Sequence, residues 1–358
     1  MTGIMRRAAL AACLVLAASA ALPLPSLAMT TGTRPRPLPI TPMPASRGDG
    51  DVTGITRLDA VAGVDRYRLR YRSDGLAIQG YLVIPREIAG RAAVILFAHG
   101  GSDDPGRPGL PLLDYLTRLA ASGPFVVLAT DYRGSAGSEG HDEFGGADVN
   151  DVVNLLPIAR RLAMADADRV GMLGFSRGAI DTYVAIRRGA PLQAAAVVSG
   201  PTDLARTYEQ TGLRVRTQIS GMLGGTPEQR PEAYRLRSAL DWPEKIGIPL
   251  LILHGDKDDR VALTGVQRLD AELTALNKPH RLLVFPGGKH MLHNFGAQRD
   301  QAIAAWFKQQ LRIDPSPRSD RLASGKAGDQ GKGHDRDQSR DGDAARAESV
   351  VTAVLDGQ

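Results

Sequence analysis

Apolar and polar positions follow two different patterns along the chain. The runs "RYRLRY" (66–71) and "LAIQGYLVI" (76–84) are rich in β-forming residues and are joined by Ser73, Asp74 and Gly75, which is typical of a hairpin. Further along, short continuous apolar runs are separated by segments with the period of a helix. Continuous apolar strands that alternate with helices indicate a parallel sheet covered on both faces.

The second pattern predicts the elements of an α/β domain. Its apolar runs predict strands at 92–98, 125–130, 169–174, 194–199, 249–254 and 281–286. Its helical segments lie at 111–122, 147–163, 177–188, 264–276 and 297–312. Residues 200–247 carry no strong strand signal, and we expect them to form a small helical insertion over the strand tips. The predicted fold class is therefore α/β, with a mostly parallel central sheet and an antiparallel hairpin before it.

The N-terminal segment has the layout of a secretory signal peptide. Arg6 and Arg7 precede an apolar stretch, and the small residues Ser26 and Ala28 close it. Proline residues within the stretch, and no basic flank after it, favour cleavage near Ala28 over a lasting membrane anchor. The segment 1–28 therefore predicts a secreted or periplasmic protein without stable membrane insertion.

The one cysteine of the chain lies within that segment. Cleavage would remove Cys13, so the mature protein is expected to have neither a disulfide nor a cysteine nucleophile. The sequence "LAAC" ending at Cys13 also matches a lipoprotein cleavage box. Few apolar residues precede that box and the apolar run continues beyond it, which favours cleavage near Ala28.

Composition divides the rest of the chain. Residues 29–52 are rich in Pro, Thr and Gly and predict a flexible linker. Residues 313–358 mix both charge signs with Gly and Ser and predict a disordered tail. The segment 53–312 is then the folded domain. The whole chain has 44 Lys and Arg against 39 Asp and Glu. The basic residues form no run and have no interleaved aromatics, so we expect no nucleic-acid partner.

A short motif marks a candidate nucleophile. In "GMLGFSRGAI" (171–180), Gly174, Ser176 and Gly178 form Gly-x-Ser-x-Gly between a predicted strand and a predicted helix. A strand that enters a helix through this motif turns sharply, and glycines are needed because side chains would collide with neighbouring strands. The serine then projects from the edge of the sheet where function collects in α/β proteins.

Candidate acids and bases follow the next strand ends. Asp256, Asp258 and Asp259 share the loop after one strand, and His290 and His293 follow the next. A serine hydroxyl needs a base to take its proton, and that base needs a carboxylate to orient it. The order serine, acid, histidine is that of α/β-hydrolases.

An oxyanion site would complete this chemistry. The backbone N–H of Arg177, at the start of the helix, is one expected donor. The glycine-rich turn "HGGS" offers Gly101 or Ser102 as the second, with His99 bracing the loop. The run "HDE" (141–143) lacks a partner at metal-ligand spacing, so we expect no metal site there. Attack by a serine hydroxyl on an acyl group needs no cofactor.

These residues resemble the catalytic domain of the prolyl oligopeptidase family. The resemblance covers roughly residues 53–312 and also rests on "YRSDGLAIQGYLVIP" (71–85), "TDYRGSAGSEG" (130–140) and "DADRVGMLGFSRGA" (166–179), and on the stretch 231–261. It implies an α/β-hydrolase fold and a serine-type hydrolase.

The resemblance also assigns residues. The family's His-Gly-x-x-Asp-x-x-Val pattern falls on His254 and selects Asp258. The aromatic-Pro-Gly pattern selects His290, with His293 in reserve, and Arg133 matches a structural brace. The chain departs from the family where Ala179 replaces a glycine and Ser102 replaces a proline.

The resemblance implies a serine peptidase acting on a peptide or small acyl substrate. The β-propeller of many relatives is not recognised in the sequence, nor is a pair of acidic residues for a peptide amino terminus. An open site of this kind also fits a carboxylesterase. A non-catalytic binding protein on the same fold is the alternative from another class.

Overall fold

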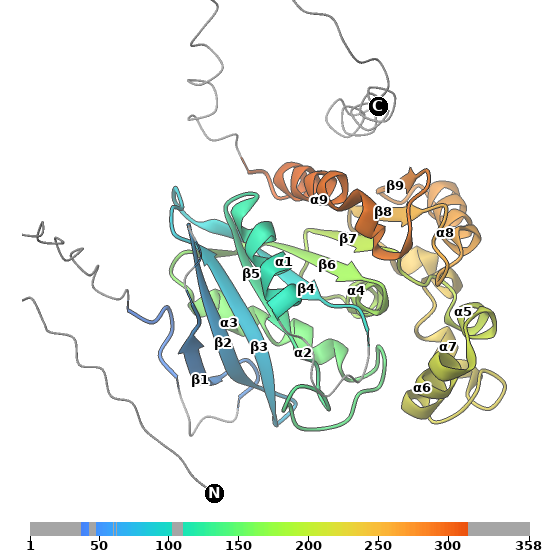
Figure 1. Ribbon diagram of the computed structural model, residues 1–358, viewed down its shortest axis with the longest axis horizontal. Helices are drawn as coiled ribbons and strands as arrows, with labels where there is room; N and C mark the ends of the chain where they lie inside the picture. The colour runs from blue at the N-terminus through green and yellow to red at the C-terminus, as the bar shows by residue number, and fades with distance from the viewer. Residues whose placement is uncertain (1–36, 43–47, 60, 62, 102–109, 314–358) are drawn as a thin grey trace, which may run out of the picture. The chain divides into compact units, whose positions relative to one another are not determined.

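The computed structural model describes residues 37–42, 48–59, 61, 63–101 and 110–313 (Figure 1). The secondary-structure elements all belong to the unit that begins at Leu38.

Several sequence expectations fall outside this part of the chain. They are the signal peptide over 1–28 with its lipoprotein box at Cys13, most of the linker over 29–52, Ser102, and the tail beyond Ile313.

The strands of the described residues form one sheet of nine, in the order β1-β2-β3-β5-β4-β6-β7-β8-β9. The strands are β1 (Val52–Arg57), β2 (Val64–Ser73), β3 (Leu76–Pro85), β4 (Ala92–Ala98), β5 (Phe125–Thr130), β6 (Ala165–Phe175), β7 (Ala194–Val198), β8 (Leu250–Gly255) and β9 (His280–Phe285). Pairing is antiparallel from β1 to β5 and parallel from β5 through β4 to β9. The fold class expected from the sequence, with a mostly parallel sheet and an antiparallel N-terminal hairpin, is confirmed.

Helices cover both faces of the sheet because its central strands are apolar on both sides. They are α1 (Leu110–Ala121), α2 (Val149–Val153), α3 (Leu156–Arg161), α4 (Arg177–Arg187), α8 (Leu263–Ala275) and α9 (Gly296–Gln310). Within β4, Ile95 and Phe97 pack in the core with α1 and α9, while Val94 and Leu96 pack with α2, α3, α4 and α8. Neighbouring residues of this continuous apolar run therefore pack in two different cores. Figure 1 shows the helices that cover the two faces of the sheet.

Two elements differ from the sequence expectation. The single helix expected over 147–163 is two short helices, α2 and α3, because the chain turns at Asn154 and Pro157 lies in the first turn of α3. The strand β1 was not expected. Its burial is only partial, and it pairs with β2 across an irregular register at Val52 and Gly54.

Residues 200–247 carry short helices and no strand. They are α5 (Leu204–Gln210), α6 (Leu213–Leu223), α7 (Pro231–Arg235) and two 3-10 turns, and Figure 1 shows the three helices grouped at one side of the sheet. The rings of Tyr208 and Tyr234 pack edge to face at 5.6 Å and join α5 to α7. The Arg237 guanidinium donates to the carbonyl oxygens of Glu143 and Phe144, at 2.8 Å each, and so ties this group to the loop before α2.

Candidate active site

Ser176 lies in the sharp turn between β6 and α4. Its backbone is at φ 52° and ψ −116°, a conformation that costs about 1–3 kcal/mol outside glycine and persists where the surroundings enforce it. The surroundings here are very close. A Cβ on Gly174 would lie 2.1 Å from the carbonyl oxygen of Gly178, and a Cβ on Gly178 would lie 2.0 Å from that of Ala98. Both glycines of the motif are therefore required by space, and the turn presents the Ser176 hydroxyl beyond the end of the sheet.

His290 faces this hydroxyl. It follows β9 at the start of the 3-10 segment η3 (His290–Phe295) and is buried. Its Nε2 atom lies 2.9 Å from Ser176 Oγ, and its Nδ1 atom lies 3.0 Å from each carboxylate oxygen of Asp258. The three side chains form a continuous chain of hydrogen bonds.

Asp258 is held in the loop after β8. Its Oδ1 atom accepts the backbone N–H groups of Arg260 and Val261 at 3.0 Å each, and His254 Nε2 lies 2.8 Å from the Val261 carbonyl oxygen. Burial alone would raise the pKa of Asp258, but the hydrogen bonds from His290 and these N–H groups outweigh it and lower the pKa to about 2. An ionised carboxylate at Nδ1 keeps a proton on that nitrogen and leaves Nε2 free to accept the serine proton.

The other candidates from the two loops lie elsewhere. The Asp256 carboxylate accepts the backbone N–H of Gly287 at 2.6 Å and so joins the loops after β8 and β9. Asp259 and His293 are exposed. The structure thus brings Asp258 and His290 to Ser176, and not their neighbours.

The turn after β4, residues 99–101, lies against Ser176, and we call it the oxyanion turn. A Cβ on Gly100 would be 3.1 Å from the Ser176 Cβ, which shows how closely this backbone passes. Gly101 has φ +86°, a conformation that favours glycine. Arg177 is the first residue of α4, so its backbone N–H has no acceptor within the helix. Both expected N–H donors therefore belong to backbone next to Ser176, and Ser102 lies outside the described residues.

The side chain of Arg177 is a feature that sequence reasoning missed. The guanidinium is buried and donates to Asp142 at 2.6 and 2.7 Å and to Asp148 at 2.6 Å. It also lies 4.1 Å from the centre of the Tyr132 ring. Burial would raise the pKa of Asp148, but Arg177 and the N–H groups of the loop hold it below its ordinary value. "HDE" (141–143) therefore contributes one partner of a buried ion-pair network.

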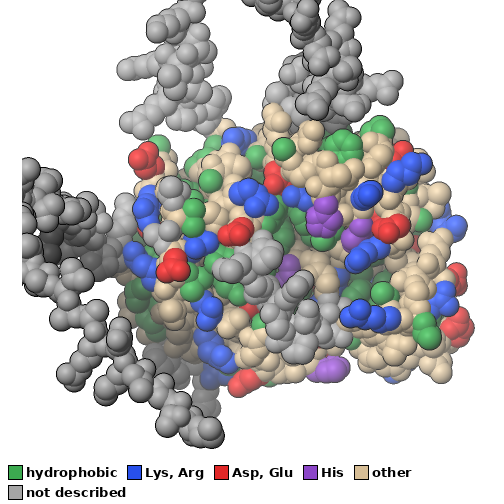
Figure 2. All heavy atoms as spheres, viewed as in Figure 1, with side chains coloured by type: hydrophobic (Ala, Val, Ile, Leu, Met, Phe, Trp, Pro, Cys, Tyr) green, Lys and Arg blue, Asp and Glu red, His purple; other side chains and the backbone are tan. Residues whose placement is uncertain are grey.

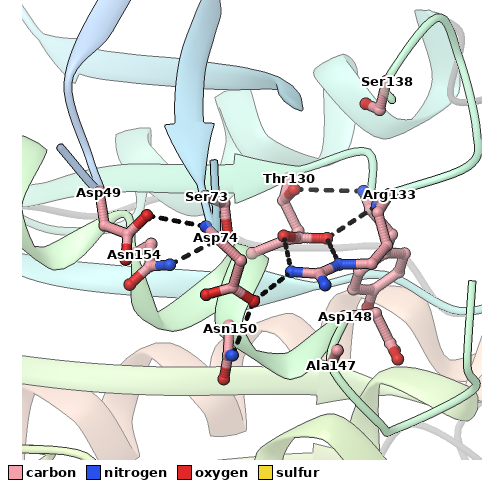
Figure 3. A network of polar contacts seen from close by, with 12 residues as sticks. Asp49, Ser73, Asp74, Thr130, Arg133, Ser138, Ala147, Asp148, Asn150 and Asn154 are labelled. Atoms are coloured by element: carbon pink, nitrogen blue, oxygen red, sulfur yellow. Dashed lines mark hydrogen bonds and ion pairs between the residues drawn. The ribbon is translucent and has the colours of Figure 1, made fainter. Parts of the chain in front are cut away.

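Arg133 lies in a second network, shown in Figure 3. Its guanidinium donates to Asp151 on α2 at 2.8 Å and to Asp74 in the β2–β3 turn at 2.7 Å. Asn150 donates to the same oxygen of Asp74 at 2.8 Å. These contacts join the hairpin, α2 and the loop after β5. They have the form of the structural brace expected at this position.

Two features of the described residues concern nucleic-acid and membrane partners. On the face shown in Figure 2, Lys and Arg side chains are interspersed with Asp and Glu. In the described ranges, none of the helices is both long and apolar enough to span a bilayer.

The fold and the site define an α/β-hydrolase-like protein of the serine hydrolase class. A family model described as "Prolyl oligopeptidase family" matches residues 113–314. The chain belongs to the prolyl oligopeptidase family of serine peptidases, as its sequence motifs predict.

Individual relatives agree with this family. The chain is 36% identical over 218 residues to the protein named uncharacterized peptidase YtmA of Bacillus subtilis, and the match covers 60% of this chain and 81% of that protein. It is 28% identical over 239 residues to human dipeptidyl peptidase 8, covering 61% of this chain. A solved puromycin-hydrolyzing peptidase of Mycobacterium tuberculosis superposes with a TM-score of 0.63 at 25% identity, over 72% of this chain.

The coverage of these relatives differs. The chain spans most of YtmA, but 25% of dipeptidyl peptidase 8 and 41% of the mycobacterial peptidase. Both of these larger proteins therefore extend well beyond the part that is similar to this chain.

Proposed function

We propose that the protein is a serine peptidase in which Ser176, His290 and Asp258 act as the catalytic triad. The observation that carries the proposal is the unbroken chain of contacts from Asp258 through His290 to Ser176, at 3.0 and 2.9 Å. Three side chains from three separate loops meet at hydrogen-bonding distance, and a hydroxyl nucleophile requires this arrangement.

The geometry supports the following steps. His290 Nε2 takes the proton of the Ser176 hydroxyl as Oγ attacks the acyl carbonyl carbon, and the carbonyl oxygen becomes an oxyanion. The backbone N–H groups of Arg177 and Gly101 stabilise that oxyanion. His290 then gives its proton to the leaving amine, and an acyl group remains on Ser176. Water then attacks the acyl carbonyl carbon while His290 takes a proton from it. His290 returns this proton to Ser176 Oγ as the bond to the acyl group breaks and the acid leaves. Asp258 stabilises the imidazolium in both halves of the reaction.

The proposed substrate is a peptide bond, which the family membership supports. The test is turnover of one acyl group presented as an aryl amide and as an aryl ester, with Ser176→Ala as the blank. Serine-dependent cleavage of the amide supports the peptidase. Cleavage of the ester alone would assign a carboxylesterase on a peptidase fold, because an ester carries the better leaving group. Cleavage of neither by a folded protein would favour a non-catalytic binding protein.

We also propose that the protein is exported. Arg6 and Arg7 before an apolar stretch, and small residues up to Ala28, support a signal peptide. Expression of the full chain in a bacterial host and N-terminal sequencing of the periplasmic product tests this. The proposal expects a mature chain that begins near Met29, and an uncleaved chain in the cytoplasm would contradict it.

A further inference from the structure

Tyr132 lies in the loop after β5, two residues beyond Thr130, and takes an unusual backbone conformation. Its φ is +57°, in the left-handed region that a bulky aromatic residue rarely adopts, and its side chain is buried. Such strain persists only where surrounding contacts enforce it, and it concentrates at functional sites. The contacts of Tyr132 therefore indicate what this strain achieves.

Backbone hydrogen bonds on both sides of Tyr132 hold this conformation. Its own N–H donates to Thr130 Oγ1 at 3.1 Å. The next N–H, that of Arg133, donates to Asp151 Oδ2 at 2.8 Å, and the Arg133 guanidinium binds the same carboxylate. The network of Figure 3 thus fixes the backbone immediately after Tyr132 and directs the Tyr132 side chain.

The side chain reaches the oxyanion turn. The Tyr132 hydroxyl donates to the carbonyl oxygen of His99 at 3.0 Å, and the Tyr132 and His99 rings lie 4.4 Å apart. On the other side, the Arg177 guanidinium lies 4.1 Å from the Tyr132 ring centre, and its NH1 atom lies 3.4 Å from the Gly101 carbonyl oxygen. Tyr132 therefore packs between the residue after the nucleophile and the turn opposite it.

His99 transmits this contact to the expected oxyanion donor. Its Nδ1 atom lies 2.8 Å from the carbonyl oxygen of Gly100, and a carbonyl only accepts, so Nδ1 carries the proton. Burial lowers the pKa of His99 to about 4, which keeps the ring neutral in this tautomer. The Gly100 carbonyl and the Gly101 N–H belong to one planar peptide group. Fixing the first therefore fixes the direction of the second.

We propose that Tyr132 is a positioning residue that orients the oxyanion turn, and through it the Gly101 N–H, toward the acyl oxygen on Ser176. The inference rests on the proposed serine hydrolase function and adds to it a residue that does not touch the substrate. Oxyanion donors act only within a few tenths of an ångström of the right position, so a loosened turn lowers the rate of the chemical step.

The test compares Tyr132→Phe with Tyr183→Phe. Each substitution removes one buried hydroxyl and keeps the ring, but the Tyr183 hydroxyl on α4 has no hydrogen-bond partner among the described residues and so makes no hydrogen bond to the turn. We expect Tyr132→Phe to lower kcat about ten- to a hundredfold and to change KM less than about twofold, since removal of a complete donor costs about 10²–10³. Tyr183→Phe should leave both constants within about twofold of the parent protein.

Inhibitor binding separates positioning from a general structural role. A peptide trifluoromethyl ketone forms an oxyanion on Ser176, whereas the free acid product does not. The proposal expects Tyr132→Phe to weaken the ketone by the same factor as kcat/KM and to leave the affinity for the acid unchanged.

Each remaining outcome overturns the inference. If Tyr132→Phe retains the kcat of the parent, or weakens ketone and acid equally, Tyr132 does not position the turn. If the parent protein shows no Ser176-dependent turnover, the proposed function fails together with the inference. The parent enzyme and Ser176→Ala in the same assay therefore distinguish the two failures.

Discussion

The Nε2 atom of His290 lies 2.9 Å from the hydroxyl oxygen of Ser176, although 114 positions separate the two residues in the chain. The sheet produces this proximity. Ser176 follows β6 and His290 follows β9, and parallel pairing from β6 through β7 and β8 to β9 brings the carboxyl ends of these strands to one edge. Asp258 follows β8 at the same edge, and its carboxylate forms a hydrogen bond with Nδ1 of His290.

Replacement of Asp258 by Asn should abolish most of the activity. The amide cannot accept the Nδ1 proton as a carboxylate does, so His290 loses both its orientation and the stabilisation of its charged form. We expect kcat to fall by about 10⁴, as is typical for the orienting acid of such a triad. Asp259→Asn is the matched control, because Asp259 is an exposed carboxylate in the same loop. Equal losses in the two variants would contradict the assignment.

The same carboxylate predicts a dependence of stability on pH. The pKa of Asp258 is about 2 in the folded protein and lies below the unfolded value of about 3.9. A carboxyl group whose pKa is lower in the folded protein stabilises the fold at pH values above the pKa of the unfolded chain. This stabilisation is lost as the pH falls through about 2. Urea unfolding should therefore show a smaller acid destabilisation for Asp258→Asn than for the parent between about pH 5 and pH 2. Parallel pH profiles of the two proteins would be inconsistent with this pKa.

Asp181 predicts a stability that falls as the pH rises, which is opposite to the effect of Asp258. Asp181 is fully buried on α4. Neither of its carboxyl oxygens has a hydrogen bond of good geometry within the described residues, although the Tyr132 hydroxyl is near. Burial raises its pKa well above the ordinary value. The folded protein keeps this proton while the unfolded chain releases it near pH 3.9, so stability falls as the pH rises, by at most about 1.4 kcal/mol per pH unit. Asn cannot lose a proton, so the stability advantage of Asp181→Asn over the parent should grow with pH.

Unfolding in urea at several pH values from about 5 to 8 measures this difference. The control is Asp114→Asn, which changes an exposed carboxyl on α1. A difference between Asp181→Asn and the parent that stays constant over this range would show that Asp181 is ionised in the folded protein.

Replacement by Ala should change stability in opposite directions at Gly178, in the turn that holds Ser176, and at Gly221 on α6. A Cβ at Gly178 would lie 2.0 Å from the carbonyl oxygen of Ala98, which is backbone of β4 and cannot move without separating β4 from α4. We expect Gly178→Ala to lower the free energy of unfolding by about 1–3 kcal/mol. Gly221 is exposed on α6 and a Cβ there would have no neighbour within 4 Å, so Gly221→Ala should raise stability by up to about 1 kcal/mol. Chemical denaturation of both variants checks the two signs.

The fold was predictable where strands are buried on both faces. β4 coincides with its apolar run at 92–98, and β5 with the run at 125–130, because every residue of both strands is buried and only Thr130, at the end of β5, is polar. β1 escaped prediction since its residues are mostly half-buried and the run contains Gly54. The break between α2 and α3 was missed because the apolar period continues across Asn154, although Pro157 is a signal that could have indicated it.

The candidate site was predictable where chemistry is concentrated in motifs. Gly174, Ser176 and Gly178 stand in a spacing with a steric cause, and the order of the acid and the histidine follows from the strand ends. The buried partners of Arg177 were missed because Asp142 and Asp148 lie in a loop that the chain pattern does not place near Ser176. Tyr132 was missed for a related reason, since its contact with His99 joins the ends of two neighbouring strands.

The most direct measurement is covalent labelling of the protein with a fluorophosphonate, followed by mass spectrometry of its peptides. An activated serine attacks the phosphorus atom, so we expect one adduct on Ser176 in the parent and none in Ser176→Ala. His290→Ala should label slowly, because the hydroxyl then lacks its base. Labelling of Ser176→Ala at the rate of the parent, or no labelling of the folded parent, would contradict the assignment of Ser176 as the nucleophile.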